Sequence, residues 1–257
     1  NDQVRLNNSL QMIYSWCITW GMKLNTSKTH CISFTNKKSP LNYTYRIGNS
    51  IIEKCNQVKY LGITLTPNLN WEPHILAMCQ KAEKKLSFLR RKLRNAPPHI
   101  KINAYKTLIR PCLEYADLIW SPHQKYLISK IERIQKLAVR FVYSEFARQS
   151  STADLLARAN LKQLFQRRIM SRLKFLYQLY HGHFHISRSH YLQDPLKQSF
   201  RLNHSKTIRQ PLSRVNAHKH SLFPSAISLW NSLPNDIVCC STIDSFINRI
   251  QCIEFAP

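Results

Sequence analysis

Residues 58–71 read VKYLGITLTPNLNW and join two chemically different parts of the chain. Before them, short runs rich in β-branched and aromatic residues alternate with turn residues, and after them long basic amphipathic segments follow. Alternation over the first eight residues predicts a strand, in which Gly62 would mark a bulge or a close approach of another backbone. Pro67 ends that strand, and Pro73 predicts the first turn of a helix. The stretch therefore predicts an α+β fold in which strands precede helices.

The segment before this stretch predicts one helix and several short antiparallel strands. Apolar residues recur at helical spacing over residues 2–20, and Gly21 stands where a C-terminal cap belongs. Alternation over residues 28–35 predicts a strand, and Gly48-Asn49 is a two-residue hairpin turn signal between two further strands. These elements make half of an α+β domain, so we expect the missing half to lie upstream.

The segment after the stretch predicts three amphipathic helices, at residues 73–94, 100–120 and 125–143. The first and third carry a narrow apolar stripe, and the second is expected to be kinked or broken at Pro111. Three such helices joined by short loops predict a small bundle. The stripes are Ile75, Cys79, Ala82, Leu86, Leu89 and Leu93 in the first helix, and Leu127, Ile131, Ile134, Ala138 and Phe141 in the third.

Residues beyond 150 give a weaker pattern. Thr152 can cap a short helix, and residues 161–180 predict a longer one that Gly182 closes. Residues 183–220 are polar and without clear period, which indicates a long connection or loose strands. Two further short helices are predicted at residues 223–230 and 243–252.

The charge balance of the chain points to a polyanionic partner. Lys and Arg outnumber Asp and Glu by 38 to 13 in 257 residues, which gives a formal net charge of +25. An excess of this size favours nucleic acid over the alternative, a solvated basic face without a partner. No apolar run approaches the length of a membrane span, and the eight scattered Cys favour a reduced intracellular setting. The first residue is Asn1 rather than Met, so we expect a fragment of a longer product.

Basic residues on the predicted helices are the candidate phosphate contacts. Lys and Arg on a rigid face suffice to bind a nucleic-acid backbone without reading its sequence. Tyr60 and Trp71 could stack on bases, although each is also a good core residue, and for Trp71 the core is favoured. The first patch consists of Lys84, Lys85, Arg90, Arg91, Lys92 and Arg94, and a second of Arg167, Arg168, Arg172 and Lys174.

Four motifs follow one another along nearly the whole chain. They are Trp16-x-x-x-Trp20-x-Met22-x-Leu24-Asn25-x-x-Lys28-Thr29, Lys59-Tyr60-Leu61-Gly62-Ile63 with Leu69-x-Trp71-x-x-His74-Ile75, Leu108-Ile109-Arg110-Pro111-x-Leu113-Glu114-Tyr115-Ala116, and Leu229-Trp230-Asn231-Ser232-Leu233-Pro234. In this order they resemble the palm, the primer-grip hairpin, the thumb and the C-terminal tail of reverse transcriptases from non-LTR (LINE-type) retrotransposons, the jockey-like branch most closely. Any one motif alone is weak, but four in the expected order make a specific match.

The resemblance implies a domain plan for the chain. Residues 1–66 would be the C-terminal part of the palm with the primer grip, 67–148 a mainly helical thumb, and 149–257 a small α-rich C-terminal region. The parent protein would be an RNA-directed DNA polymerase that acts in the nucleus and cytoplasm, with Mg²⁺ as a cofactor of the full-length parent only. The implied partners are an RNA template, a DNA primer and the missing N-terminal palm and fingers of the same polyprotein. Residues Lys59, Tyr60, Leu61 and Gly62 would contact the nucleic acid at the grip.

The catalytic carboxylates that the resemblance implies are missing from the chain. The family holds two metal ions on a Tyr/Phe-Ala-Asp-Asp turn, and no Asp-Asp occurs in this sequence. Tyr115-Ala116-Asp117 is followed by Leu118 in a helical pattern, so we expect Tyr115 and Ala116 in the core and no metal there. The resemblance makes Lys28 a possible general acid, against the simpler interpretation of an exposed Lys that caps a strand.

Metal sites are not expected elsewhere. Adjacent Cys239 and Cys240, with Cys252 distant and no His between them, do not form a zinc knuckle. The His-rich stretch from His181 to His190 has no Cys or carboxylate among its His residues to complete a ligand set, so a solvent-facing segment is favoured.

Two other functions compete with the polymerase fragment. The chain could be a non-enzymatic basic RNA-binding module, or a degenerate remnant of an element. It could also be a basic scaffold protein without a nucleic-acid role.

Overall fold

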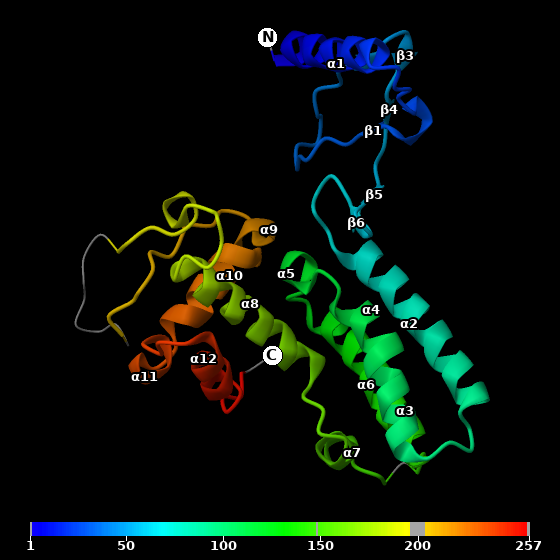
Figure 1. Cartoon of the computed structure of the whole chain (residues 1–257), viewed down its shortest axis with the longest axis vertical. Helices are drawn as coiled ribbons and strands as arrows, with labels where there is room; N and C mark the ends of the chain where they lie inside the picture. Colours follow the sequence, from blue (N-terminus) through cyan, green and yellow to red (C-terminus); the bar gives the residue numbers. More distant parts are fainter. Residues whose placement is uncertain (1, 148, 196–203, 256–257) are drawn as a thin grey trace. The chain divides into compact units, whose positions relative to one another are not determined.

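The structure, a computed structural model, describes residues 2–147, 149–195 and 204–255. The chain divides into two compact units, Asn1–His74 and Ile75–Pro257. Helices dominate and the few strands are short, which agrees with an α+β class (Figure 1). The functional boundaries placed after residues 66 and 148 stay predictions.

The first unit begins with helix α1, Asp2–Thr19, as the spacing of its apolar residues predicted. Gly21 has a φ of +67°, and its amide donates to the carbonyl of Ile18 over 3.0 Å. The amide of Met22 donates to the carbonyl of Cys17 over 2.8 Å. These two bonds satisfy carbonyls at the end of the helix, so the predicted glycine cap is confirmed.

Helix α1 keeps most of its apolar side chains exposed. Cys17 is its one buried residue, whereas Ile13 is 52% and Trp16 56% exposed. The helix is joined to the following strands by Asn7, whose amide group donates to the carbonyl of Thr44 and accepts from the amide of Arg46. Large exposed apolar residues on a helix typically indicate a surface that another segment covers.

The strands of the first unit form three two-stranded pairs. Strand β1, His30–Cys31, pairs in parallel with β4, Glu53–Lys54, after a 3₁₀ turn at Thr26–Lys28. The predicted strand over residues 28–35 is therefore mostly wrong, as is the expectation that all pairs are antiparallel. Strands β2, Arg46–Ile47, and β3, Ser50–Ile51, are antiparallel and joined by Gly48-Asn49, which confirms that hairpin.

The stretch that begins at Val58 is a hairpin and not one strand. Strand β5, Val58–Tyr60, is antiparallel to β6, Ile63–Leu65, and Tyr60 pairs with Ile63. Leu61 and Gly62 form the turn with φ values of +46° and +82°. Positive φ at both central residues matches the right-handed twist of the strands. Gly62 thus serves a turn, and its predicted bulge is wrong.

The bundle helices of the second unit bury the predicted apolar stripes. In α2, Glu72–Lys92, the stripe residues are buried except Leu93, which follows the helix and is half-buried. Helix α6, Lys125–Tyr143, buries all five residues of its predicted stripe. The amide of Glu72 donates to the side chain of Asn70, which caps the start of α2.

The segment between α2 and α6 is distorted just before Pro111, in line with the predicted kink, but it stays helical through Pro111 and breaks only after Glu114. It consists of α3, Pro98–Ala104, a π-helical segment, Tyr105–Ile109, α4, Arg110–Glu114, and α5, Asp117–Trp120. Pro111 has no amide hydrogen to donate the regular helical hydrogen bond, and the π-helical segment, whose turns are wider, lies just before it. Ala116, at a φ of +53°, separates α4 from α5.

The C-terminal part contains six helices among the described residues. Residues 183–220 are mostly irregular, as predicted, and 196–203 of them lie outside the described part of the chain. Ser151, not the predicted Thr152, caps α7 by accepting the amide of Asp154. Trp230, Phe246 and Tyr177 centre a core between α8, α10 and α12. The helices are α7 Thr152–Arg158, α8 Leu164–Tyr180, α9 Asn216–Lys219, α10 Leu222–Asn231, α11 Asn235–Val238 and α12 Ile243–Ile250, with a 3₁₀ turn at Arg188–His190.

Polar side chains join the bundle to α8. The buried carboxylate of Glu132 on α6 accepts the amides of Leu164 and Phe165, over 3.2 and 2.6 Å, and so caps α8. Burial raises the pKa of Glu132, while these bonds and Arg168 oppose the rise. Negative charge at a helix N-terminus is stabilising.

Among the described residues, no helix is both long and apolar enough to cross a membrane.

Candidate nucleic-acid interface

The hairpin tip presents all four grip residues to solvent. Lys59, Tyr60, Leu61 and Gly62 are exposed, Tyr60 at 64% and Leu61 at 71%. Leu61 and Gly62 form the turn, and Lys59 and Tyr60 are the last two residues of β5 before it. An aromatic ring and an ammonium group beside a tight turn can contact a nucleic-acid strand without reading its sequence.

The polar face of α2 carries a second exposed group of cations. Lys81, Lys84, Arg91 and Lys92 are exposed, and at 100° per residue they span about 100° of the helix circumference. This arc lies opposite the buried stripe. Arg94, also exposed, follows directly after the helix.

Phe88 lies within this arc and was not singled out by the sequence. Its ring is 50% exposed, between Lys84 and Arg91 along the helix. A groove of about 380 Å³ is lined by Lys84, Phe88 and Leu108 together with Lys85 and Leu89. Cations beside an exposed aromatic ring are typical of surfaces that bind single strands. The exposure of Phe88 could have been predicted from the sequence, because Phe88 falls outside the apolar stripe of the helix.

Two of the six predicted α2 contacts are tied into the fold. The ammonium group of Lys85 donates to the carbonyl of Leu108 and to the sulfur of Cys112, both over 3.0 Å. Arg90 donates from Nη2 to the carbonyl of Leu137 on α6 over 3.1 Å, and its Nε is buried. These side chains hold helices together, which leaves Lys84, Arg91, Lys92 and Arg94 as the exposed members.

The residues of the second predicted basic patch do not form an exposed surface. Arg168 is 1% and Arg172 7% exposed, and Arg167 forms an ion pair with Glu114. Only Lys174 of that group is exposed. Arg168 and Arg172 lie at i+4 spacing between Leu164 and Leu176, which are buried on the same face. That spacing could have predicted their burial.

The structure places the two residues considered for catalysis, Lys28 and Asp117, in different elements. Lys28 is exposed at the end of a 3₁₀ turn, and its role stays a prediction. Asp117 opens α5 and is buried, and burial raises the pKa of its carboxyl group to about 6. Tyr115 is 57% exposed, so its predicted core position is wrong, and Ala116 is half-buried.

His30, Glu53 and Cys55 are brought together by the β1–β4 pair. Their ligand atoms lie within 4.8 Å of one another, and the Cys55 sulfur is 3.5 Å from Nδ1 of His30. Imidazole, carboxylate and thiolate are zinc ligands, so these residues could hold such an ion with an open position. His30 and Glu53 are exposed, and the expectation that the chain binds no metal remains a prediction.

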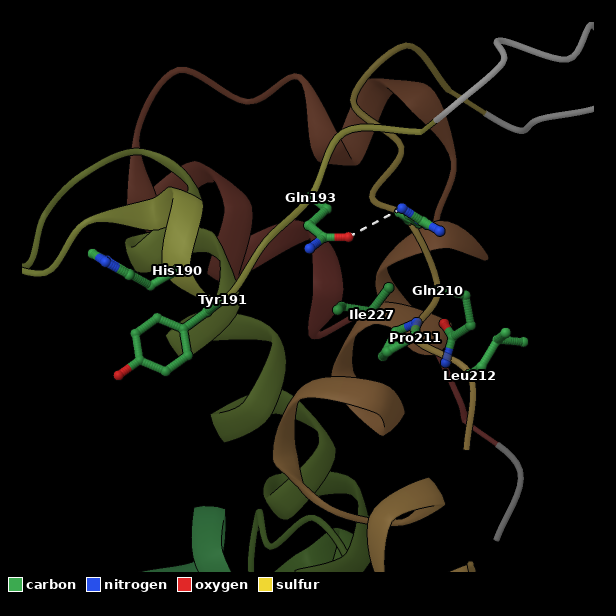
Figure 2. Close-up of a pocket in the computed structure, with 8 residues that line it drawn as sticks. His190, Tyr191, Gln193, Gln210, Pro211, Leu212 and Ile227 are labelled. Atoms are coloured by element: carbon green, nitrogen blue, oxygen red, sulfur yellow. Dashed lines mark hydrogen bonds between the residues drawn. The ribbon is translucent and has the colours of Figure 1, made fainter. Parts of the chain in front are cut away.

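A cavity of about 320 Å³ lies beside α10 (Figure 2). Arg209 donates to the side-chain oxygen of Gln193 over 3.3 Å across it, while His190 and Tyr191 turn away from the other lining residues. Ile227 supplies an apolar wall. Its described lining holds no carboxylate, so an acid–base pair with His190 is not formed there.

Comparison with known proteins supports the resemblance seen in the motifs. The chain is 29% identical over 147 residues to "Probable RNA-directed DNA polymerase from transposon BS" of Drosophila melanogaster, which covers 55% of this chain and 16% of that protein. It is 26% identical over 138 residues to "RNA-directed DNA polymerase from mobile element jockey" of the same organism, covering 52% and 15%. An uncharacterized protein of Caenorhabditis elegans is 28% identical over 131 residues, covering 51% of this chain and 66% of that protein.

These matches span only about one sixth of the length of the two named polymerases. No family model and no solved structure matches the chain. The matches nevertheless agree with the branch that the four motifs indicated. Over about half of its length, the chain is similar to the RNA-directed DNA polymerases of non-LTR retrotransposons.

Proposed function

We propose that this chain is the template–primer-binding, C-terminal part of an RNA-directed DNA polymerase of a non-LTR retrotransposon. The observation that carries the proposal is the exposed arc of Lys81, Lys84, Arg91 and Lys92 on α2, with Phe88 inside it. Cations fixed on a rigid helix attract phosphates, and the aromatic ring offers a face to a base. The similarity to polymerases of this class makes an RNA template and a DNA primer the fitting partners.

In this proposal the chain holds nucleic acid and does not perform the chemistry. Two-metal polymerisation needs carboxylates that hold both ions, and the sequence has no Asp-Asp pair. Mg²⁺ would act in the full-length parent, on the N-terminal palm and fingers. The exposed apolar residues of α1, such as Trp16 and Ile18, supply a surface that these parts would cover. The parent would act in the nucleus and cytoplasm.

Binding to a primer–template tests the proposal. The chain should bind an RNA template annealed to a DNA primer, measured by fluorescence anisotropy. With about six phosphate contacts, affinity should fall on the order of a thousandfold between low and moderate salt. With Mg²⁺ and labelled nucleotides added, no primer extension above a no-protein control is expected. Salt-independent binding would favour the scaffold alternative, and extension would mean that the active site lies within this chain.

A further inference from the structure

A cavity of about 410 Å³ lies within the second unit, and the residues that line it include none from α2. It is lined from the end of α5, the middle of α8, and the segment that runs from α9 into α10. Its lining combines apolar side chains, such as Phe165 and Ile169, with cationic groups and the hydroxyl groups of Ser121, Ser225 and Ser228. The described lining residues include no carboxylate.

Arg172 gives this cavity a buried positive charge. Its guanidinium donates from Nη1 to the hydroxyl oxygen of Ser225, while Nε and Nη2 have no hydrogen-bond partner. Among the described residues, no ion pair within 4.0 Å reaches Arg172. Burial lowers the pKa of Arg172 to about 10, opposed by Asp117 and assisted by Arg168. A buried cation without an ion pair is costly, so an anion bound beside Arg172 would stabilise it.

Three further basic side chains, those of His123, Lys219 and His220, line the same cavity. The rings of His123 and His220 stack with centroids 3.8 Å apart and planes at 8°. Lys219, which precedes His220, is exposed at the end of α9. Burial lowers the pKa of His220, and His123, Lys219 and Arg172 lower it further. The cavity is therefore electropositive, and its described lining offers no anion to balance these charges.

We propose that this cavity binds a phosphoryl group, with Arg172 and Lys219 as its cationic ligands and the His220 ring as a further N–H donor. Phosphate oxygens accept charge-assisted hydrogen bonds from guanidinium and ammonium groups, and the Ser121 and Ser228 hydroxyl groups add neutral donors. The volume exceeds that of a lone phosphate, so the apolar wall can take a group attached to it. The phosphoryl group belongs either to a free ligand or to a nucleic-acid backbone, and the backbone case rests on the proposed function.

Titration of the whole chain with inorganic phosphate tests the site. Calorimetry should show saturable binding with a dissociation constant below about 1 mM, and the pKa of His220, measured by NMR, should rise when phosphate is present. Lys219→Gln and Arg172→Met should each weaken binding by about tenfold or more. Because Lys219 is exposed, its replacement leaves the fold intact even if Arg172→Met does not.

Lys174→Gln is the matched control, since Lys174 is exposed on α8 and does not line the cavity. It should bind phosphate within about twofold of the unaltered chain. Equal losses in Lys174→Gln and Lys219→Gln would overturn the proposal, as would no saturable binding or an unchanged pKa of His220.

Competition separates the two sources of the phosphoryl group. Displacement of phosphate by an RNA–DNA primer–template would assign the cavity to the backbone, and retention of phosphate beside bound primer–template would assign it to a free ligand. The phosphate titration stands even if the chain fails to bind primer–template, so the two proposals fail separately.

Discussion

Arg90 on α2 donates a hydrogen bond from Nη2 to the main-chain carbonyl of Leu137 on α6 over 3.1 Å. Its neighbour Arg91 points to solvent. Two adjacent cations of one basic run therefore have different roles, one in the fold and one on the surface. The same division separates Lys85, which is bonded to Leu108, from exposed Lys84.

Arg90→Met should destabilise the second unit, whereas Arg91→Met should not. Loss of a hydrogen bond from a charged donor costs about 1.5–3 kcal/mol, and a surface replacement stays within about 0.5 kcal/mol. Urea unfolding of both variants measures the difference in the free energy of unfolding. Equal stabilities would mean that the contact with Leu137 contributes nothing.

Phe88→Leu should weaken binding to single-stranded RNA with little change in stability. The ring is half exposed, so Leu keeps its apolar contacts and helical preference but removes the aromatic face. Stacking of one base is worth about 1–3 kcal/mol, which corresponds to a loss of about tenfold in affinity. Anisotropy with a labelled oligonucleotide measures it, with Leu108→Ala, a replacement in the same groove, as the control. An unaffected Phe88→Leu variant would exclude stacking at this position.

Asp117 should make the stability of the second unit depend on pH. Burial raises the pKa of its carboxyl group to about 6, whereas in the unfolded chain this pKa has its ordinary value of 3.8. The folded state therefore holds the proton more tightly, so its contribution to stability is present below pH about 4 and is lost as pH rises through about 6. The expected loss is on the order of 2–3 kcal/mol.

Asp117→Asn should remove this pH dependence. The amide cannot ionise, so the variant should gain stability relative to the unaltered chain between pH 4 and pH 7. Urea unfolding of both proteins at the two pH values makes the comparison. A difference that stays constant with pH would show that Asp117 titrates normally.

The helices could be predicted wherever one apolar face decides the structure. The stripe from Leu127 to Phe141 predicted α6, and all five of its residues are buried. The hairpin at Gly48-Asn49 was predictable because both residues suit its turn. The turn at Leu61 was not, since Leu seldom adopts the positive φ of +46° that it has here. The short β1–β4 pair depends on residues distant in sequence, which no local pattern reports.

The candidate site was predicted by composition but not residue by residue. Counting charges grouped Arg90 with Arg91 and counted Arg168 as a surface residue, although Arg168 is 1% exposed. Charge alone does not distinguish an exposed cation that contacts phosphate from a buried cation that joins two helices, because both are Lys or Arg residues on a helix. Helical phase does distinguish them, and it also identifies Phe88 on the exposed arc.

The most direct test of the account compares two sets of three exposed cations. Arg91, Lys92 and Arg94 lie at the end of α2, and Lys174, Arg209 and Arg214 lie in the C-terminal part, so each set holds two Arg and one Lys. Each set is replaced by Gln, which removes equal charge and preserves the buried side chains.

Affinity for an RNA–DNA primer–template is then measured by anisotropy across a range of salt concentrations. The account predicts that the α2 set loses far more affinity than the C-terminal set, and that its slope of log K against log salt becomes shallower by about three. Equal losses and equal slopes for the two sets would contradict it, because net charge alone would then attract the nucleic acid.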